Sequence, residues 1–207
     1  SKKKNVTEEH KLLPITLYNK YKAECEPLLF KHSSKDFCTT IFRPATVCGY
    51  SSRQRLDLSV NILTNYAYNK NYIKVFGGNQ LRPNLHILDY CRVVLKLINS
   101  PINKIQKKIY NVGNQNMSIN HIANHVKKNV EKKKKKLIKI YKIKSNDKRS
   151  YHINSDKIFK ELCFKPKYNI SDAVDELCVA FENKKIKNSF KKKEYYNVEA
   201  LIKKNIT

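Results

Sequence analysis

The sequence predicts an α/β fold with a largely parallel sheet. Two observations support this: short runs rich in β-branched residues alternate with longer segments whose apolar residues recur at helical spacing, and no internal repeat is visible. A length of 207 residues suits one domain, or one and a half, with a sizeable core. Parallel sheets place their sites beyond the carboxyl ends of the strands, which we expect here at residues 43–46, at the Gly77 turn and at Val112 and Gly113.

The first elements are a helix, a strand and a second helix. We expect a helix over 17–30, which Pro27 should kink or end. The β-branched run 38–44 predicts a buried strand that stops at Pro44. After a loop, apolar residues at helical spacing predict a helix over 58–69.

The rest of the chain continues the alternation. Strands are expected at 72–76, 85–88, 108–113 and 137–143. Asp89 should cap a helix that runs to about 99, and Ser118 should cap another that carries Ile122 and Val126. The lysine run 132–136 is expected to be a solvated helix end, and three further helices are expected at about 155–163, 170–184 and 195–204.

The formal charge of +26 first suggests a polyanionic partner such as nucleic acid. However, only six of the 43 basic residues are Arg, and base-edge and phosphate readers favour the planar Arg fork. Lys is instead spread over nearly every segment, as a compositional bias of the genome would produce. We therefore expect nucleic acid to be an unlikely partner, and keep a basic nucleic-acid-binding module as the second hypothesis.

Other site classes receive little support. The six cysteines form no C-x-x-C pair, so reduced and mostly buried thiols in a cytoplasmic protein are expected. No apolar run approaches the ~18 residues of a membrane span, and no signal peptide is visible. His121 and His125 lie four apart without the glutamate of an H-E-x-x-H site, so no metal is expected.

The stretch ITLYNKYKAECE places Tyr18 and Lys22 four positions apart, on one face of the first predicted helix. A lysine ammonium beside a phenol favours the phenolate, so Tyr18 could act as a general acid or base. Tyr66 and Lys70 repeat the same spacing. The spacing alone therefore does not decide between chemistry and coincidence.

The few arginines of the chain suggest a second candidate site, one that binds phosphate. Arg82, in NQLRPNLHILDY, lies between a turn and a strand and could bind a phosphate or diphosphate, or pair with a surface acid. Arg149 has a similar setting, and Thr46 and Asn61 are possible polar lining residues. The chain contains neither G-x-G-x-x-G nor G-x-x-x-x-G-K, and so lacks a dinucleotide or P-loop cradle of its own.

The order of these segments resembles a known family. PITLYNKYKAECE, IFRPATVCGY, DLSVNILTNYA, IKVFGGNQLRPNLHILDYCR, KIYNVGNQNMSINHIA and DKRSYHINSDKIFKELCFKPKYNISDAV resemble the extended short-chain dehydrogenases/reductases. Within them, the chain is similar to the NAD-dependent epimerases/dehydratases of nucleotide sugars. The match covers almost the whole chain in order.

The resemblance implies the C-terminal part of a Rossmann-like NAD(P)-binding fold with a smaller mixed α/β substrate domain. Residues 1–47 would complete the Rossmann domain. Residues 48–207 would mainly form the substrate domain, with about 84–114 returning to the Rossmann sheet. The glycine-rich unit, the ribose-binding acid and a catalytic Ser or Thr would precede Ser1, in roughly a hundred further residues.

The resemblance also implies residue roles. Tyr18 would shuttle a proton at a sugar hydroxyl, while Lys22 would hold the cofactor ribose and lower the tyrosine pKa. Tyr66 and Lys70 fail as a rival pair, because they fall on a substrate-domain helix. Pro44 would lie beside the nicotinamide of NAD or NADP.

Four residues would face a nucleotide-sugar substrate. Asn61 would contact a phosphate of the substrate, and Arg82 and Arg149 would bind its diphosphate. Thr46 stands where relatives usually have an asparagine that contacts the substrate. Cys48 similarly replaces a usual tyrosine, which leaves the sugar pocket unusual. The implied reaction is epimerisation, dehydration or reduction, in a homodimer formed through the Tyr18 helix and the next long helix. A non-catalytic fragment of the family is the remaining alternative.

Overall fold

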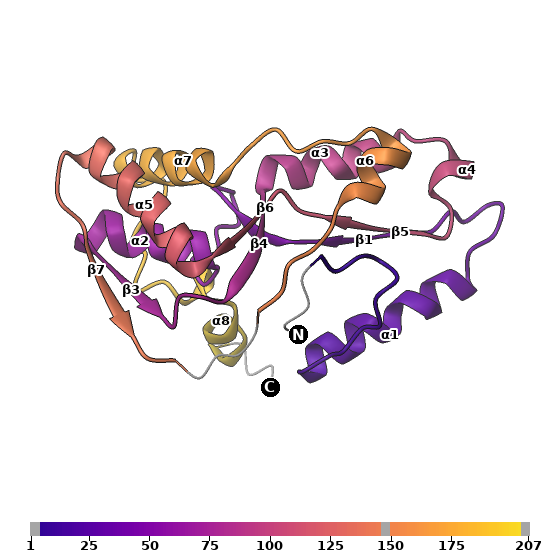
Figure 1. The fold of residues 1–207 in the computed structure, drawn as a ribbon, viewed down its shortest axis with the longest axis horizontal. Helices are drawn as coiled ribbons and strands as arrows, with labels where there is room; N and C mark the ends of the chain where they lie inside the picture. Colours follow the sequence, from indigo (N-terminus) through magenta and orange to yellow (C-terminus); the bar gives the residue numbers. More distant parts are fainter. Residues whose placement is uncertain (1–4, 146–149, 204–207) are drawn as a thin grey trace.

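A computed structural model describes residues 5–145 and 150–203. It contains three small sheets along an elongated molecule (Figure 1). Strands β1 (Thr40–Pro44) and β5 (Lys108–Val112) pair in parallel, as do β3 (Tyr72–Phe76) and β7 (Lys139–Ile143). A central sheet has the order β2-β4-β6, with β2 (Thr46–Cys48) parallel and β6 (Gln115–Ser118) antiparallel to β4 (Leu81–His86). The predicted α/β class with mainly parallel pairing is confirmed.

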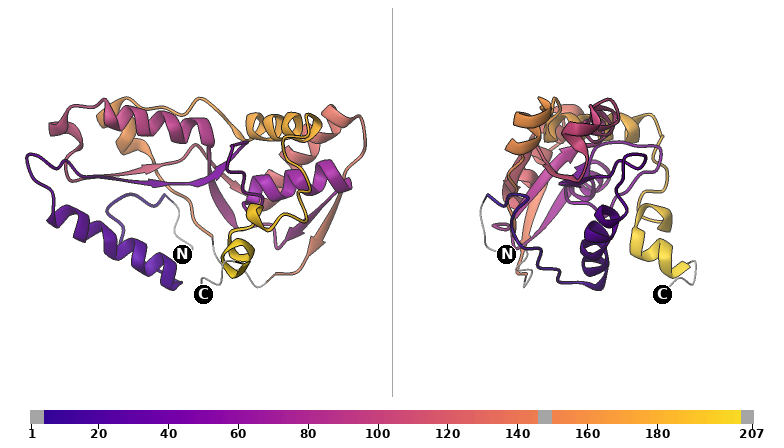
Figure 2. Two further views of the ribbon diagram at one scale, coloured as in Figure 1. Left: turned by 180° about the vertical axis from the view of Figure 1, so that it is seen from behind. Right: turned by 90° about the vertical axis from the view of Figure 1, so that its right-hand side faces the viewer.

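The helices cover the outer sheets. They are α1 (Leu17–Lys31), α2 (Ser59–Lys70), α3 (Ile87–Ile98), α4 (Ile102–Ile105), α5 (Ile119–Lys134), α6 (Asp156–Leu162), α7 (Ile170–Glu182) and α8 (Asn197–Lys203). Figures 1 and 2 show α3 and α6 on one side of β1 and β5, and α1 on the other side. A short 3-10 turn, Lys193–Tyr195, precedes α8.

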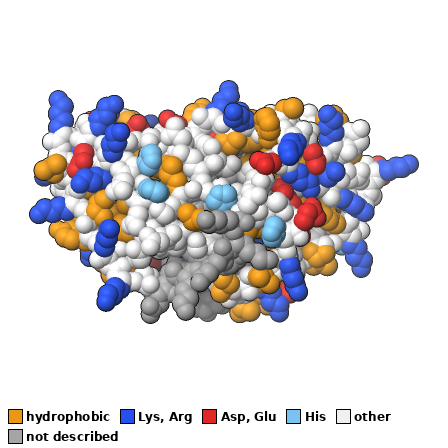
Figure 3. All heavy atoms as spheres, in the orientation of Figure 1, with side chains coloured by type: hydrophobic (Ala, Val, Ile, Leu, Met, Phe, Trp, Pro, Cys, Tyr) orange, Lys and Arg blue, Asp and Glu red, His pale blue; other side chains and the backbone are white. Residues whose placement is uncertain are grey.

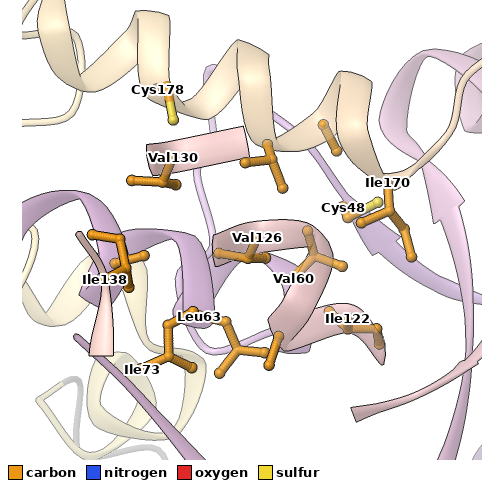
Figure 4. Packing of buried hydrophobic residues seen from close by; sticks show 14 of the residues in the cluster. Cys48, Val60, Leu63, Ile73, Ile122, Val126, Val130, Ile138, Ile170 and Cys178 are labelled. Atoms are coloured by element: carbon orange, nitrogen blue, oxygen red, sulfur yellow. The ribbon is translucent and has the colours of Figure 1, made fainter. Parts of the chain in front are cut away.

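The largest core lies between β3, β7 and the three helices α2, α5 and α7. Val60, Ile73 and Val126 are fully buried there (Figure 4). Burying one such side chain contributes about 1.5–3 kcal/mol. A second cluster, which includes Tyr110 and Val93, lies between the β1/β5 sheet and helices α3 and α6. A third, smaller cluster contains Leu56, Leu177 and Phe181, so the apolar positions of the described chain pack in three separate clusters.

Residues far apart in the sequence pair near the carboxyl ends of β1 and β5. Pro44 lies opposite Val112, and Val6 forms an isolated parallel bridge with Ile153. The Val6 amide donates to the His152 carbonyl at 2.8 Å. The pairing of β1 with β5 joins a strand before residue 47 to one within 84–114, as the predicted division requires. The division into domains itself stays a prediction.

Pro27 does not end α1, since the helix continues to Lys31. The expected kink at this residue stays a prediction. Proline removes one intrahelical hydrogen bond and frees a carbonyl of the preceding turn. None of the residues of α1 is buried, so water can satisfy that carbonyl. The proline is tolerated because this helix is solvated.

Asp89 does not cap α3, also contrary to prediction. Strand β4 extends to His86, whose Nδ1 accepts the Leu88 amide at 3.1 Å and so caps the helix. Asp89 lies in the first turn with no exposed surface, where its carboxylate accepts the amides of Lys167 at 3.0 Å and Tyr168 at 2.9 Å. It also pairs with Arg92. Asp89 therefore joins α3 to the segment that leads into α7.

Strand β2 lies in a segment that was expected to be a loop, and β6 lies where no strand was predicted. They contain three and four residues, too few for a clear alternation of apolar and polar side chains. The lysine run is a helix end, as expected: α5 stops at Lys134, and Lys135 has a left-handed φ of 51°. Lysines in a last turn interact favourably with the helix dipole.

All six cysteines are free thiols, but the expectation that most are buried was wrong. Only Cys48 and Cys178 are buried, while Cys25, Cys91 and Cys163 are exposed. Their positions on outer helix surfaces, or just past a helix end, explain the difference. Within residues 5–145 and 150–203, none of the helices is long and apolar enough to cross a membrane.

Candidate functional site

Tyr18 and Lys22 lie on the first two turns of α1. The helix begins there because the Thr16 hydroxyl accepts the Asn19 amide at 3.2 Å. The Lys22 Nζ lies 5.4 Å from the centroid of the Tyr18 ring, and 68% of Tyr18 is exposed. Among the described residues, none forms a hydrogen bond with the Tyr18 hydroxyl or the Lys22 ammonium. Both groups are thus open to a bound molecule.

An ion pair fixes α1 to β1. The guanidinium of Arg43 binds the Glu26 carboxylate through two hydrogen bonds, of 2.8 and 2.5 Å, and donates to the Glu8 carbonyl at 3.1 Å. Bidentate pairs of this kind fix orientation as well as distance. The strand that carries Arg43 ends at Pro44, so the pair relates the helix to the carboxyl end of β1.

The carboxyl ends of two strands meet as predicted. The Ala45 amide donates to the Val112 carbonyl at 2.7 Å, which brings Pro44 beside the end of β5. Thr46 then opens β2 and lies opposite Asn84 of β4. The Gly77 turn belongs instead to the β3/β7 sheet, where the Gly77 amide bonds to the Ile143 carbonyl.

Arg82 lies on β4, two residues before Asn84, the residue that pairs with Thr46. Its Nη1 donates to the Leu81 carbonyl at 3.0 Å, and its guanidinium carbon lies 5.7 Å from the centroid of the Tyr151 ring. Arg82 and Thr46 therefore belong to one sheet. Arg149, the other predicted arginine, lies outside the described residues.

Asn61 supports the loop that follows β2. Its Oδ1 accepts the Gly49 amide at 3.1 Å, and its Nδ2 donates to the Arg55 carbonyl at 2.8 Å. Only 3% of Asn61 is exposed. Gly49 has a φ of 104°, and a Cβ there would lie 3.1 Å from His86 Nε2, so this turn requires glycine.

His86 and Glu176 form a second support for the same loop, which the sequence reading missed. Because His86 Nδ1 accepts the Leu88 amide, Nε2 carries the proton of the neutral ring. Nε2 lies 3.2 Å from Glu176 Oε2 without hydrogen-bond geometry, and this contact is an ion pair only when the ring is protonated at both nitrogens. Glu176 Oε2 also accepts the Tyr50 amide at 3.4 Å. The H-x-x-D pattern of His86 to Asp89 was the only feature of the sequence that could have pointed to His86. Nothing pointed to Glu176, which lies 90 residues away on α7.

A cavity of about 430 Å³ opens at the carboxyl end of β5. Its polar lining includes Asn114, His152, Asn154 and Asp156, and its floor includes Ile158. None of the predicted site residues in the described part of the chain lines it. Sequence analysis missed these polar residues because they lie in a segment without regular periodicity.

No candidate metal centre is present: the described residues contain no group of three or more His, Cys, Asp or Glu side chains arranged to hold an ion. His121 and His125 lie on α5.

The sequence matches the model of the NAD dependent epimerase/dehydratase family over residues 1–113, more than half of the chain. The chain belongs to this family. The predicted resemblance is thereby confirmed, and Tyr18, Lys22, Pro44, Thr46, Asn61 and Arg82 all lie within the matched residues. Their individual roles stay predictions.

Solved structures share the fold of this family member. The dTDP-glucose 4,6-dehydratase of Bacillus anthracis, in complex with NAD, has 20% identity and a TM-score of 0.75, over 92% of this chain and 60% of that chain. The UDP-glucuronic acid 4-epimerase of Bacillus cereus, with UDP-glucuronic acid and NAD, has 23% identity and a TM-score of 0.73, over 88% and 57%.

RMD from Pseudomonas aeruginosa, complexed with NADPH, has 16% identity and a TM-score of 0.73, over 86% of this chain and 60% of that chain. Such likenesses establish the Rossmann-like fold predicted above. This chain spans about 57–60% of the length of these three solved chains.

Proposed function

We propose that this chain contributes the proton-transfer and substrate-binding part of an NAD(P)-dependent enzyme that epimerises, dehydrates or reduces a nucleotide-activated sugar. The observation that supports it best is the adjacent, exposed pair of Tyr18 and Lys22 within the residues that match the family model. The solved relatives named as a dTDP-glucose dehydratase and a UDP-glucuronic acid epimerase support the same substrate class.

The residues present fit a nicotinamide cofactor, NAD or NADP. The Tyr18 phenol and the Lys22 ammonium are open, and Pro44 is exposed at a strand end. Lys22 would hold the cofactor ribose, and Pro44 would lie along the nicotinamide. The bound cofactor supplies the hydride donor or acceptor.

Tyr18 would take up and release the proton at a sugar hydroxyl. A free tyrosine titrates near pH ~10, so it is a poor base at neutral pH unless a nearby positive charge favours the phenolate. Lys22, one helical turn away, would provide that charge. The cation is placed by helix geometry alone, which explains why an otherwise exposed helix could hold the pair.

The substrate side would be formed by Thr46, Arg82 and Arg149, with the guanidinium groups binding the diphosphate. The resemblance also assigns a phosphate contact to Asn61. Its amide already holds the loop after β2, so that contact would require the loop to shift. The excess of lysine would further attract an anionic substrate.

Catalysis would also require parts that these 207 residues do not contain. The sequence has no glycine-rich dinucleotide cradle, so a βαβ unit and a catalytic Ser or Thr would have to come from elsewhere. Exposed Leu17, Tyr21 and Leu28 on α1 support a homodimer through this helix. Six free thiols fit the reducing cytoplasm.

The test uses a polypeptide that joins this chain to a glycine-rich unit. We expect Tyr18→Phe to bind NAD normally, measured by fluorescence titration, and to lose turnover of nucleotide sugars. Tyr66→Phe, which changes the other Y-x-x-x-K pair, should turn over normally. Full turnover by Tyr18→Phe would remove the assigned role.

A further inference from the structure

The outward face of the β3/β7 sheet is uncovered in the described chain. Ile73 and Val75 of β3 point into the core and have no exposed surface, so the alternate positions point outward. Phe76 is 54% exposed and Tyr141 is 48% exposed. The six outward positions are Tyr72, Lys74 and Phe76 on β3, opposite Lys139, Tyr141 and Ile143 on β7. We call these six residues, with Tyr66, Lys70 and Phe190, the aromatic–lysine face.

Four rings of this face form a continuous row. The ring centroids of Tyr141 and Tyr72 lie 5.9 Å apart, those of Tyr72 and Tyr66 5.6 Å, and those of Tyr66 and Phe190 4.9 Å. The row begins on β7, crosses β3 and reaches α2. Tyr141, Tyr72 and Tyr66 belong to a sheet and a helix that pack in the main core, and this packing fixes the backbone that carries the three rings.

Lysines alternate with these rings. Across the two strands Tyr72 faces Lys139, and Lys74 faces Tyr141. The Lys74 Nζ lies 5.6 Å from the Tyr72 ring centroid, and the Lys70 Nζ lies 5.3 Å from that of Phe190. None of the six outward strand positions is acidic. Figure 3 shows basic and hydrophobic side chains interspersed at the end of the molecule that carries β3 and β7.

The basic surface continues along the chain from Phe190. Lys191, Lys192 and Lys193 line a cavity of about 480 Å³ together with Glu194 and Tyr195. The Lys192 Nζ lies 6.0 Å from the centroid of the Tyr195 ring. Rings and ammonium groups are therefore paired beyond the sheet as well, with one carboxylate among them.

Contrary to the expectation from composition, we propose that the aromatic–lysine face binds single-stranded nucleic acid. Unpaired bases stack on exposed rings, and neighbouring cations neutralise phosphates. The exposed rings of Phe76 and Tyr141 supply the first and the lysines between the rings supply the second, while Tyr66, Tyr72 and Phe190 are half-buried. The alternation of ring and ammonium suits a strand in which base and phosphate alternate. Because the cations are Lys and not the bidentate Arg fork, binding should not depend on base sequence.

The geometry favours nucleic acid over an anionic membrane. Surface-binding segments of membrane proteins are usually amphipathic helices with one continuous apolar face. Here the face is a sheet, three of its five rings are tyrosines, and lysines separate the rings. Of the three outward cross-strand pairs, only Phe76 with Ile143 is apolar on both strands, which is too small an apolar area to anchor in the acyl region.

Binding of a fluorescein-labelled oligothymidine to this chain, followed by anisotropy over a range of salt concentrations, tests the proposal. We expect saturable binding that weakens steeply with salt. The double variant Phe76→Ala/Tyr141→Ala should weaken it about tenfold or more, since each stacked base depends on its ring. Lys74→Gln/Lys139→Gln should lower the slope against salt.

Two matched variants serve as controls. Tyr21→Ala/Phe37→Ala removes rings that are 62% and 51% exposed elsewhere on the molecule, and should leave binding unchanged. Lys160→Gln/Lys165→Gln removes the same charge from another surface and should have a smaller effect than Lys74→Gln/Lys139→Gln. Circular dichroism verifies that every variant is folded.

Three outcomes would overturn the proposal. The first is no binding of oligothymidine. The second is equal loss in the face variants and the controls, which would show that net charge alone is responsible. The third is binding to phosphatidylserine vesicles but not to oligothymidine, which would identify a lipid surface.

Discussion

Helices α1 and α7 have similar lengths, 15 and 13 residues, but opposite environments. Seven residues of α7 are buried, whereas none of α1 is. α1 is held by its Thr16 cap and by the pair of Glu26 with Arg43. Helix α7 therefore contributes buried apolar side chains to the fold, whereas every side chain of α1 stays at least partly accessible to solvent.

The largest contrast should come from two acidic residues: Asp89 of α3, which holds the segment leading into α7, and Glu24 of α1. Asp89, buried beneath the segment that leads into α7, accepts the Lys167 and Tyr168 amides and pairs with Arg92. Asp89→Ala leaves these donors unpaired and should lower the free energy of unfolding by about 3–5 kcal/mol, measured by urea denaturation.

The matched change on α1 is Glu24→Ala, whose partner Lys20 lies 3.8 Å away with both side chains more than half exposed. Its effect should stay within about 0.5 kcal/mol. Equal losses for Asp89→Ala and Glu24→Ala would contradict the comparison.

Leucines give the next contrast. Leu177 on α7 has no exposed surface, and Leu28 on α1 is 58% exposed. Leu177→Ala should cost about 2–5 kcal/mol of unfolding free energy, because it leaves a cavity. Leu28→Ala should change it by less than about 0.5 kcal/mol. A large cost for Leu28→Ala in dilute solution would show that α1 is covered there, for instance by a second copy of the chain.

Removing the amino-terminal caps of the two helices should give a smaller difference in unfolding free energy. Asn169 accepts the Ser171 amide at 2.7 Å and forms a capping box with Asp172, so Asn169→Ala should cost about 1 kcal/mol of global stability. Thr16→Ala should instead leave the global value unchanged and speed hydrogen exchange of the α1 amides, measured by mass spectrometry. Global destabilisation by Thr16→Ala would mean that α1 unfolds together with the core.

The smallest expected effect is a difference in thiol reactivity between the two helices. Burial raises the pKa of Cys178 on α7 to about 12, with the nearby Asp175 carboxylate as a lesser cause. The native thiol therefore stays protonated, and the stability linked to this shift is present below pH 9 and is lost as the pH rises toward 12. Iodoacetamide at pH 8 should modify exposed Cys25 and spare Cys178, as measured by mass spectrometry of peptides. Rapid labelling of native Cys178 would show that α7 opens locally.

Periodicity predicted most of the fold because it records burial. The strand at 72–76 was predicted to the residue, since its alternating pattern has its buried positions facing one core. β2 and β6 were missed because their partners on β4, and not their own side chains, define them. The first helix was predicted correctly to within one residue, but Pro27 does not end it, because solvent can satisfy the carbonyl that the proline leaves unpaired.

The candidate site was predictable only where motif and spacing coincide. The Tyr18–Lys22 spacing follows from helix geometry, and the meeting of Pro44 with the end of β5 follows from parallel pairing. Glu176 could not be found in this way, because its contact with His86 depends on how α7 packs over the central sheet. The aromatic–lysine face was equally hidden, since its rings come from four separate segments.

The bridge between Val6 and Ile153 has a consequence for biosynthesis. The neighbouring contact, from the Asn5 amide to His152, spans 147 residues, so the segment around Asn5 leaves the ribosome long before its partner exists. Contacts of such high sequence separation slow folding, because the loop must close before the contact stabilises anything. During translation the segment before α1 must wait, solvated and unpaired, until the residues around His152 have been made.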